Sequence, residues 1–362
     1  MTFDVQTANS QRCCEAAAAA HANKRMYMVS VYSATHFLVD FACAFLMFRS
    51  IAGTPDAYLC VLIYNFCAFA MQMPLGVIAD KWNRNYLFAI FGCVLVGLAY
   101  GLVHIPVAAV IVVGIGNAMF HIGGGIDVLN ISEKKLCALG VFVSPGAFGI
   151  YYGAMLGKGS GFSAAFIPCA LIAAAGLIFM SYRAQRGTYP KNAAFSLEGI
   201  GSKRIFIAAA CLFLVVCLRS FAGLTLNFSW TSVGHWGTAL LCAVVFGKTI
   251  GGFAADRFGL IKTAFVSLGI ASLLFLFPAN APAGVTALLL FNMTMPITLW
   301  AMAKIIPGAK GFAFGLLTFG LFLGFLPVYL GVKISAGLFW LFALLAALSL
   351  GLLLTGLRKA RL

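Results

Sequence analysis

A histidine and an aspartate lie four residues apart, at His36 and Asp40, within the first long apolar run of the sequence. Side chains four apart share one face of a helix, and a run of this length would place both near the middle of a bilayer. A histidine beside a carboxylate changes charge near physiological pH, which suits the uptake and release of protons. The pair therefore predicts a proton-coupling site, with a structural hydrogen bond that fixes helix packing as the alternative.

A further histidine, His121, lies halfway along a later apolar run and is followed by three glycines (123–125). Consecutive glycines weaken a helix and leave room for a bend or a close neighbour, and interrupted helices often mark the binding sites of transporters. A packed histidine on a tight helix contact explains the pattern equally well. We place His121 with His36 and Asp40 in the predicted proton-coupling set.

Two cations, Arg219 and Lys248, lie inside apolar runs of the second half of the chain. A charge at the bilayer centre costs about 2.5–3.5 kcal/mol on insertion scales, so such residues usually face a cavity or a partner. Few acids lie at the same depth, and Asp40 is the obvious partner. We expect the two cations to attract an anionic or zwitterionic substrate. Further polar residues could line the same cavity: Asn65, Asn117, Tyr151, Asn292 and Trp300. Alternatively, these side chains hold helices together.

The sequence shows no constellation typical of an enzyme. It contains no Walker loop for nucleotide phosphates and no recognisable nucleophile–base pair. The 11 cysteines form no CxxC pair and no cysteine–histidine spacing of a metal site. We therefore expect neither an enzyme nor a bound cofactor or metal.

The composition is that of an integral membrane protein. Of the 362 residues, 62% are hydrophobic and 9% are charged, against about 45–50% and 25% in soluble domains. The net charge is +15, but the basic residues stand singly or in pairs between apolar runs. A nucleic-acid-binding protein would instead cluster them on one solvated face, so we exclude nucleic acid as a partner.

Twelve apolar runs are long enough for spanning helices of roughly 20 residues. Counting Lys and Arg with both termini cytoplasmic puts 19 on the inside and 3 on the outside, which satisfies the positive-inside rule. We expect a cytoplasmic tail at 1–25, a six-helix half at 26–183, a cytoplasmic linker at 184–203, and a second six-helix half with a short cytoplasmic tail at 204–362. The predicted spans are 26–50, 57–79, 86–103, 107–131, 136–157, 162–182, 205–227, 236–255, 260–278, 283–303, 311–330 and 334–357.

Two short charged segments repeat at a nearly constant offset. They read GVIADKWNRN from position 76 and GGFAADRFGLIK from position 251, and their aspartates, Asp80 and Asp256, are 176 residues apart. Asn117 and Asn292 are 175 apart in later runs. Asn83 and Gly259 hold equivalent places suited to a left-handed turn residue. Two parallel repeats of six helices are the layout of a large class of transporters.

Both segments resemble the signature loop of the major facilitator superfamily. The resemblance implies a latch that holds the two halves closed on the cytoplasmic side and breaks on opening. A solvated loop that merely sets topology is the alternative. The residues expected to form this gate are Gly76, Asp80, Lys81, Arg84, Asp127, Gly252, Asp256 and Arg257. We expect Asp127 to pair with nearby lysines, Lys134 or Lys135, or with the first charged segment.

Several segments are also similar to the fosmidomycin-resistance group of exporters within that superfamily. They read HFLVD, QMPLGVIAD, GIGNAMFHIGG, GAFGIYYG and LRSFAGLTLNF, in that order along the chain. This similarity implies efflux by proton antiport.

The sequence as a whole predicts an all-α membrane protein of the major facilitator fold, monomeric, in a bacterial cytoplasmic membrane. Its expected partners are a small molecule, protons and the lipid bilayer, and its expected function is secondary active transport. An uncoupled facilitator or lipid transporter on the same fold, or a non-transporting membrane receptor, are the alternatives.

Overall fold

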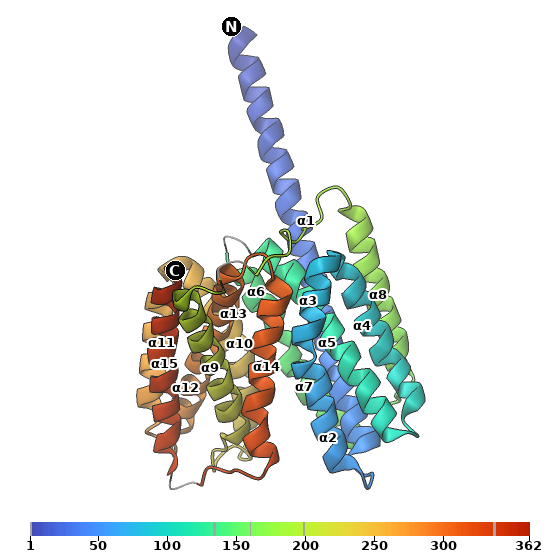
Figure 1. Ribbon diagram of the computed structural model, residues 1–362, viewed down its shortest axis with the longest axis vertical. Helices are drawn as coiled ribbons and strands as arrows, with labels where there is room; N and C mark the ends of the chain where they lie inside the picture. Colours follow the sequence, from blue (N-terminus) through green and yellow to red (C-terminus); the bar gives the residue numbers. More distant parts are fainter. Residues whose placement is uncertain (1, 133–134, 160, 198–199, 336–337) are drawn as a thin grey trace.

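The computed structural model describes residues 2–132, 135–159, 161–197, 200–335 and 338–362, with side chains from residue 23 onward. The regular secondary structure within these ranges is all helical. Two groups of helices face each other, the first formed by α1 to α8 and the second by α9 to α15 (Figure 1). Both termini lie at the same end of the helix bundle, which we call the terminal end (Figure 1).

The first half contains six helical passes. The first is α1 (Thr2–Leu46), which continues as a π-helix at Met47–Ile51, and the second joins α2 (Ala57–Asn65) and α3 (Gln72–Trp82) through a π-helix at Phe66–Ala70. The remaining passes are α4 (Asn85–Ala99), α5 (Pro106–Ile131), the pair α6 (Cys137–Val143) and α7 (Pro145–Lys158), and α8 (Phe166–Ala184).

The second half repeats the arrangement. Its passes are α9 (Lys203–Thr225), α10 (Trp236–Phe258), α11 (Leu260–Leu274), the pair α12 (Ala281–Asn292) and α13 (Thr294–Ile305), α14 (Lys310–Tyr329) and α15 (Trp340–Ala360). Within the described ranges, eleven passes are long and apolar enough to cross a bilayer, and α11 is a shorter apolar helix. The predicted twelve-helix layout is thereby confirmed.

Three details differ from the expected helix boundaries. Residues 2–25 of the segment predicted as a tail belong to α1, which extends beyond the rest of the molecule (Figure 1). The ninth helix ends at Leu274 rather than 278, because Pro278 disfavours a helical conformation in the residue before it. The fifth pass breaks at Ser144, since Pro145 has no N–H to donate and its ring crowds the preceding turn.

The halves meet closely along two pairs of helices, α3 with α14 and α6 with α10. At the first contact Gly76 lies directly against the backbone of Gly311, and a Cβ at position 76 would overlap that backbone. The predicted turn residues are confirmed: Asn83 has φ +52° and Gly259 has φ +89°. Small residues at the seam therefore bring the two backbones together.

Candidate functional site

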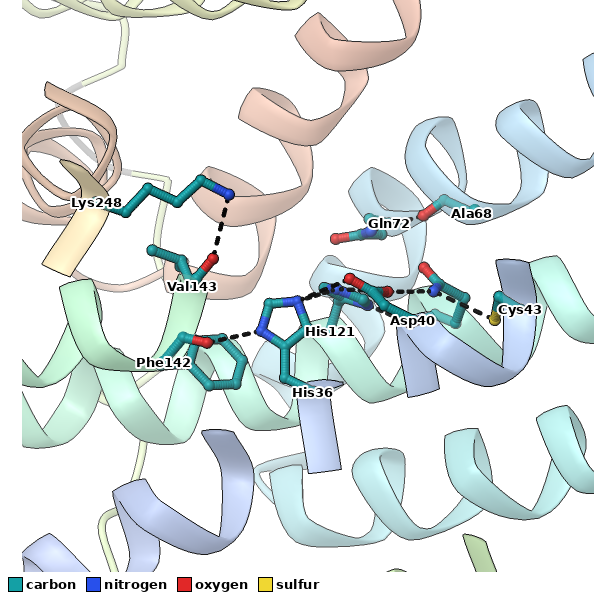
Figure 2. Close-up of polar contacts among 10 residues, drawn as sticks. His36, Asp40, Cys43, Ala68, Gln72, His121, Phe142, Val143 and Lys248 are labelled. Atoms are coloured by element: carbon teal, nitrogen blue, oxygen red, sulfur yellow. Dashed lines mark hydrogen bonds and ion pairs between the residues drawn. The ribbon is translucent and has the colours of Figure 1, made fainter. Parts of the chain in front are cut away.

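His36, Asp40 and His121 form one cluster between α1 and α5, in which His36 and Asp40 are buried and His121 is partly exposed (Figure 2). The Nε2 atom of His36 lies 3.2 Å from Oδ2 of Asp40 and 2.9 Å from Nε2 of His121. The Nε2 atom of His121 lies 3.6 Å from Oδ1 of Asp40. The fold thus brings together all three residues of the predicted proton-coupling set.

Each histidine is oriented by a backbone carbonyl at its other ring nitrogen. Nδ1 of His36 lies 2.7 Å from the carbonyl oxygen of Phe142, and Nδ1 of His121 lies 2.9 Å from that of Asn117. A carbonyl oxygen only accepts hydrogen bonds, so both Nδ1 atoms carry a proton. Both rings therefore turn Nε2 toward the other histidine and Asp40.

The break in the fifth pass explains where these carbonyls come from. Because α6 ends before Pro145, the carbonyl of Phe142 is available to His36. The neighbouring carbonyl of Val143 accepts a hydrogen bond of 3.3 Å from Nζ of Lys248 on α10 (Figure 2). The end of α6 therefore links the histidine cluster to a cation of the other half.

Asp40 has one further hydrogen bond and little free space around it. Asn117, expected to line a substrate cavity, donates to Oδ1 of Asp40 at 3.1 Å and so belongs to this cluster. Gly146, in the first turn of α7, lies over the pair, and a side chain there would overlap Oδ2 of Asp40 and Nε2 of His36. Other titratable groups that interact electrostatically with Asp40 are Cys43, Tyr64 and Lys248.

The cluster also has the composition of a metal site. One atom each from His36, Asp40 and His121 lie within 4.8 Å of one another, and ligand atoms around a tetrahedral Zn²⁺ at 2.0–2.1 Å would be about 3.4 Å apart. The sequence analysis placed these three residues in one proton-coupling set but predicted no metal site, because His121 comes from a different helix and so forms no metal-ligand spacing with the other two. Two imidazoles and a carboxylate suit a divalent transition metal.

Arg219 lies beside a separate cavity of about 380 Å³. Tyr151 and Asn292, two more of the predicted substrate-binding residues, line the same cavity, and its other walls are mostly apolar and aromatic. Nη1 of Arg219 is buried and has no hydrogen-bond partner within the described chain. An unpaired buried charged donor is costly, so the cavity suits a ligand that supplies an acceptor.

The two buried cations do not pair with Asp40 as expected. Across the described ranges, neither Arg219 nor Lys248 has a carboxylate oxygen within 4.0 Å. Lys248 interacts electrostatically with both Arg219 and Asp40. It is therefore within electrostatic range of both the arginine beside the cavity and the carboxylate of the histidine cluster.

Two predicted cavity residues lie elsewhere. Asn65 donates to the carbonyl of Val61 in its own helix. Trp300 is located at the seam between the halves, where Nε1 donates to the carbonyl of Ser132 at 2.8 Å and the amine of Lys304 lies 5.2 Å from its ring centre. Trp300 joins the two halves, a role that its position in an apolar run did not reveal.

The two repeated aspartates cap helices of the opposite half. Asp80 accepts hydrogen bonds from the backbone N–H groups of Gly311 and Phe312 at 2.8 and 2.9 Å, at the start of α14. Asp256 accepts from those of Leu136 and Cys137 at 2.6 and 2.9 Å, at the start of α6. A carboxylate at a helix N-terminus satisfies unpaired N–H groups and favours the helix dipole.

The other predicted gate residues contribute in different ways. Gly252 packs against the backbone of Leu136 and Cys137. The side chains of Lys81, Arg84 and Arg257 are exposed, and the amine of Lys81 lies over the ring of Phe195 in the linker, 5.0 Å from its centre.

Asp127 is wholly buried beside the first charged segment. Its carboxylate accepts hydrogen bonds from Asn85 at 2.8 Å, from Tyr32 at 2.7 Å, and from the hydroxyl of Tyr189 in the linker. The expected contact with the charged segment is present through Asn85. The alternative pairing with Lys135 is not formed, since no carboxylate oxygen of the described residues lies within 4.0 Å of its amine, and Lys134 lies outside the described residues. Burial, and next the charge of Asp127, raise the pKa of Tyr189 well above its usual range, so its phenol remains a donor.

Comparison with known proteins supports the fold. No family model matches the sequence, and no curated protein matches it. Solved structures that share the fold include the following three. An Escherichia coli fucose:proton symporter has a TM-score of 0.66 at 14% identity over 92% of this chain and 97% of that one. A second structure of a fucose transporter, in an outward conformation, has a TM-score of 0.60 at 14% identity over 91% and 99%. A bacterial homologue of the iron transporter ferroportin, in an outward-facing state, has a TM-score of 0.58 at 15% identity over 92% and 98%.

Proposed function

The chain has the major facilitator fold, and we propose that it is a secondary active transporter that couples a small anionic or zwitterionic molecule to protons by alternating access. The contact that supports proton coupling most directly is the 2.9 Å approach of the Nε2 atoms of His36 and His121. Since both Nδ1 atoms already carry protons, two neutral rings would face each other with two acceptors. One additional proton between them resolves this conflict, and the adjacent carboxylate of Asp40 balances its charge.

A proton suits this site better than a divalent metal does. Lys248 already places a positive charge within electrostatic range of Asp40 and His121. A divalent ion would add two charges beside it, whereas a shared proton adds one. The hydrogen bond between the histidines also needs no ligand other than the proton itself.

Substrate recognition is assigned to the cavity beside Arg219. The unpaired Nη1 atom offers a charged donor, and a guanidinium pairs well with carboxylate or phosphate oxygens. Lys248 interacts electrostatically with both Arg219 and Asp40, so the binding of an anion and the binding of a proton would influence each other.

The energy available from one proton is large enough to drive such a cycle. One charge crossing 100 mV is worth about 2.3 kcal/mol, or roughly a 50-fold gradient of substrate. The similarity to exporters favours antiport and efflux. Movement of the substrate with the protons or against them, under the pH gradient of the experiment below, decides between symport and antiport.

The test uses the purified full chain in proteoliposomes. A panel of sugar phosphates, carboxylates and zwitterions is screened for currents under an imposed pH gradient. We expect a pH-driven current with the wild type and a reduction of at least tenfold in Asp40→Asn, because the variant loses the carboxylate that balances the shared proton. Histidine ¹⁵N NMR of both proteins should show the shared proton only in the wild type.

Asp56→Asn is the matched control, because Asp56 is exposed, and it should transport normally. Undiminished proton-driven current in Asp40→Asn would refute the coupling role of the cluster. A substrate flux that does not depend on the pH gradient would identify an uncoupled facilitator. The absence of any flux and of any ligand-induced stabilisation across the panel would favour a receptor.

A further inference from the structure

A second cavity lies at the terminal end, away from the proposed transport pathway. It has a volume of about 400 Å³ and is lined by residues from three parts of the chain. These parts are the turn before α4, the last turn of α8 and the linker that follows α8. Figure 1 shows α4 and α8 side by side at the outer edge of the first half, in agreement with their extensive contact.

Four cations and no acids line this cavity. The cations are Arg84, Arg183, Arg186 and Lys191. In the part of the chain that the structure describes, none of them has a carboxylate oxygen within 4.0 Å. The carboxylate of Asp127, which does not line the cavity, already accepts three hydrogen bonds. The cavity is therefore a concentrated positive site whose charge no carboxylate of the described residues balances.

Stacked tyrosines give the cavity a defined wall. The rings of Tyr86 and Tyr182 lie parallel with their centres 3.7 Å apart, and Tyr189 packs edge-on against both. No side chain caps the N-terminus of α4 at this point, so its positive dipole end adds to the four cations. An anion with phosphate oxygens matches such a combination of guanidinium groups and helix end.

The surface beside the cavity indicates where the anion comes from. Phe179 lines the cavity, and the outer face of α8 continues from it through exposed apolar residues, Ile172 and Met180, which are 64% and 65% exposed. Positions 172, 176, 179 and 183 share one face of a helix, so the apolar surface leads directly to Arg183. We infer that this cavity binds the phosphate headgroup of an anionic phospholipid, with its acyl chains along α8.

Such a lipid would hold the linker against the first half. Arg186 and Lys191 lie in the linker, whereas Arg84 and Arg183 belong to the helical bundle. Tyr189 lines the cavity and also donates to the buried Asp127. The bound headgroup therefore bridges the linker to the helices that carry the first charged segment.

The experiment measures the thermal stability of the purified full chain in detergent with added lipid. Phosphatidylglycerol should raise the melting temperature of the wild type more than phosphatidylcholine does. Each basic residue near an anionic membrane surface contributes about 1 kcal/mol, so Arg183→Gln/Arg186→Gln should bind phosphatidylglycerol roughly 30-fold more weakly. Arg358→Gln/Lys359→Gln removes the same charge from exposed positions outside the cavity and should behave as the wild type.

If phosphatidylglycerol raised the melting temperature of both double variants by the same reduced amount, the proposed binding site would be wrong, because such a result would indicate general charge attraction. If inorganic phosphate or glycerol phosphate raised the melting temperature as much as phosphatidylglycerol did, the cavity would bind a free phosphate and not a lipid headgroup. Native mass spectrometry provides an independent readout: the wild type should retain one phosphatidylglycerol that the Arg183→Gln/Arg186→Gln protein loses.

Discussion

Asp127 shows at the scale of single residues how a buried acid can serve structure rather than transport. Three donors converge on its carboxylate from α1, from α4 and from the linker. We expect Asp127→Ala to lower the free energy of unfolding by about 3 kcal/mol, because it leaves buried donors without an acceptor. Asp127→Asn should cost less, since the amide oxygen still accepts. Denaturation in mixed detergent micelles provides the measurement, with Asp56→Ala, at an exposed position, as the control.

Contacts between functional residues could be predicted only where the residues are close together in the sequence. His36 and Asp40 were predictable as a contact because they are four apart on one helix. Their contact with His121 was not, since helical periodicity does not say which face of another helix lies opposite. For the same reason Trp300 was assigned to a cavity although it joins the two halves. The carbonyls that orient the histidines depend on the break at Ser144, which only the folded backbone reveals.

At the scale of helices, the sequence was far more informative. Apolar runs located all twelve passes because each spanning helix must satisfy its own backbone in lipid. The repeat of Asp80 and Asp256 predicted equivalent roles, and each does cap a helix of the opposite half. The π-helical segments at Met47–Ile51 and Phe66–Ala70 left no signal in the sequence, because one extra residue per turn barely alters an apolar pattern.

The contact between α3 and α14 gives a prediction about the gate. Gly76→Ala would place a methyl group into the backbone of Gly311. This should separate the two helices and weaken the hydrogen bonds by which Asp80 caps α14. We expect the native Cys137, beside the second cap, to react several-fold faster with maleimide as the terminal end opens. Peptide mass spectrometry follows the labelling rate at Cys137.

Gly53→Ala is the control, because nothing lies within 4 Å of the Cβ position there. An unchanged rate at Cys137 in a folded Gly76→Ala protein would show that the seam tolerates separation without opening.

At the scale of the whole molecule, contacts hold the two halves together at both ends. The terminal end has the two aspartate caps. At the opposite end the rings of Tyr58 on α2 and Tyr329 on α14 stack with centres 4.1 Å apart, and each hydroxyl donates to the other residue's carbonyl, at 2.8 and 3.2 Å. Helix caps contribute about 0.5–2 kcal/mol each, so the closure by the two aspartate caps is comparable in energy to one proton crossing 100 mV.

The alternating access that we propose requires the Tyr58–Tyr329 contact to open and close in each cycle. A Tyr58→Cys/Tyr329→Cys protein, joined by a short thiol-cleavable cross-linker, should therefore lose the proton-driven current almost completely. Cleavage of the linker with dithiothreitol should restore it, because the halves can separate again. Each single cysteine variant, treated in the same way, should remain active and thereby exclude damage at other cysteines. Transport that persisted in a fully cross-linked protein would mean that these ends stay together during the cycle, and that the substrate enters between other helices.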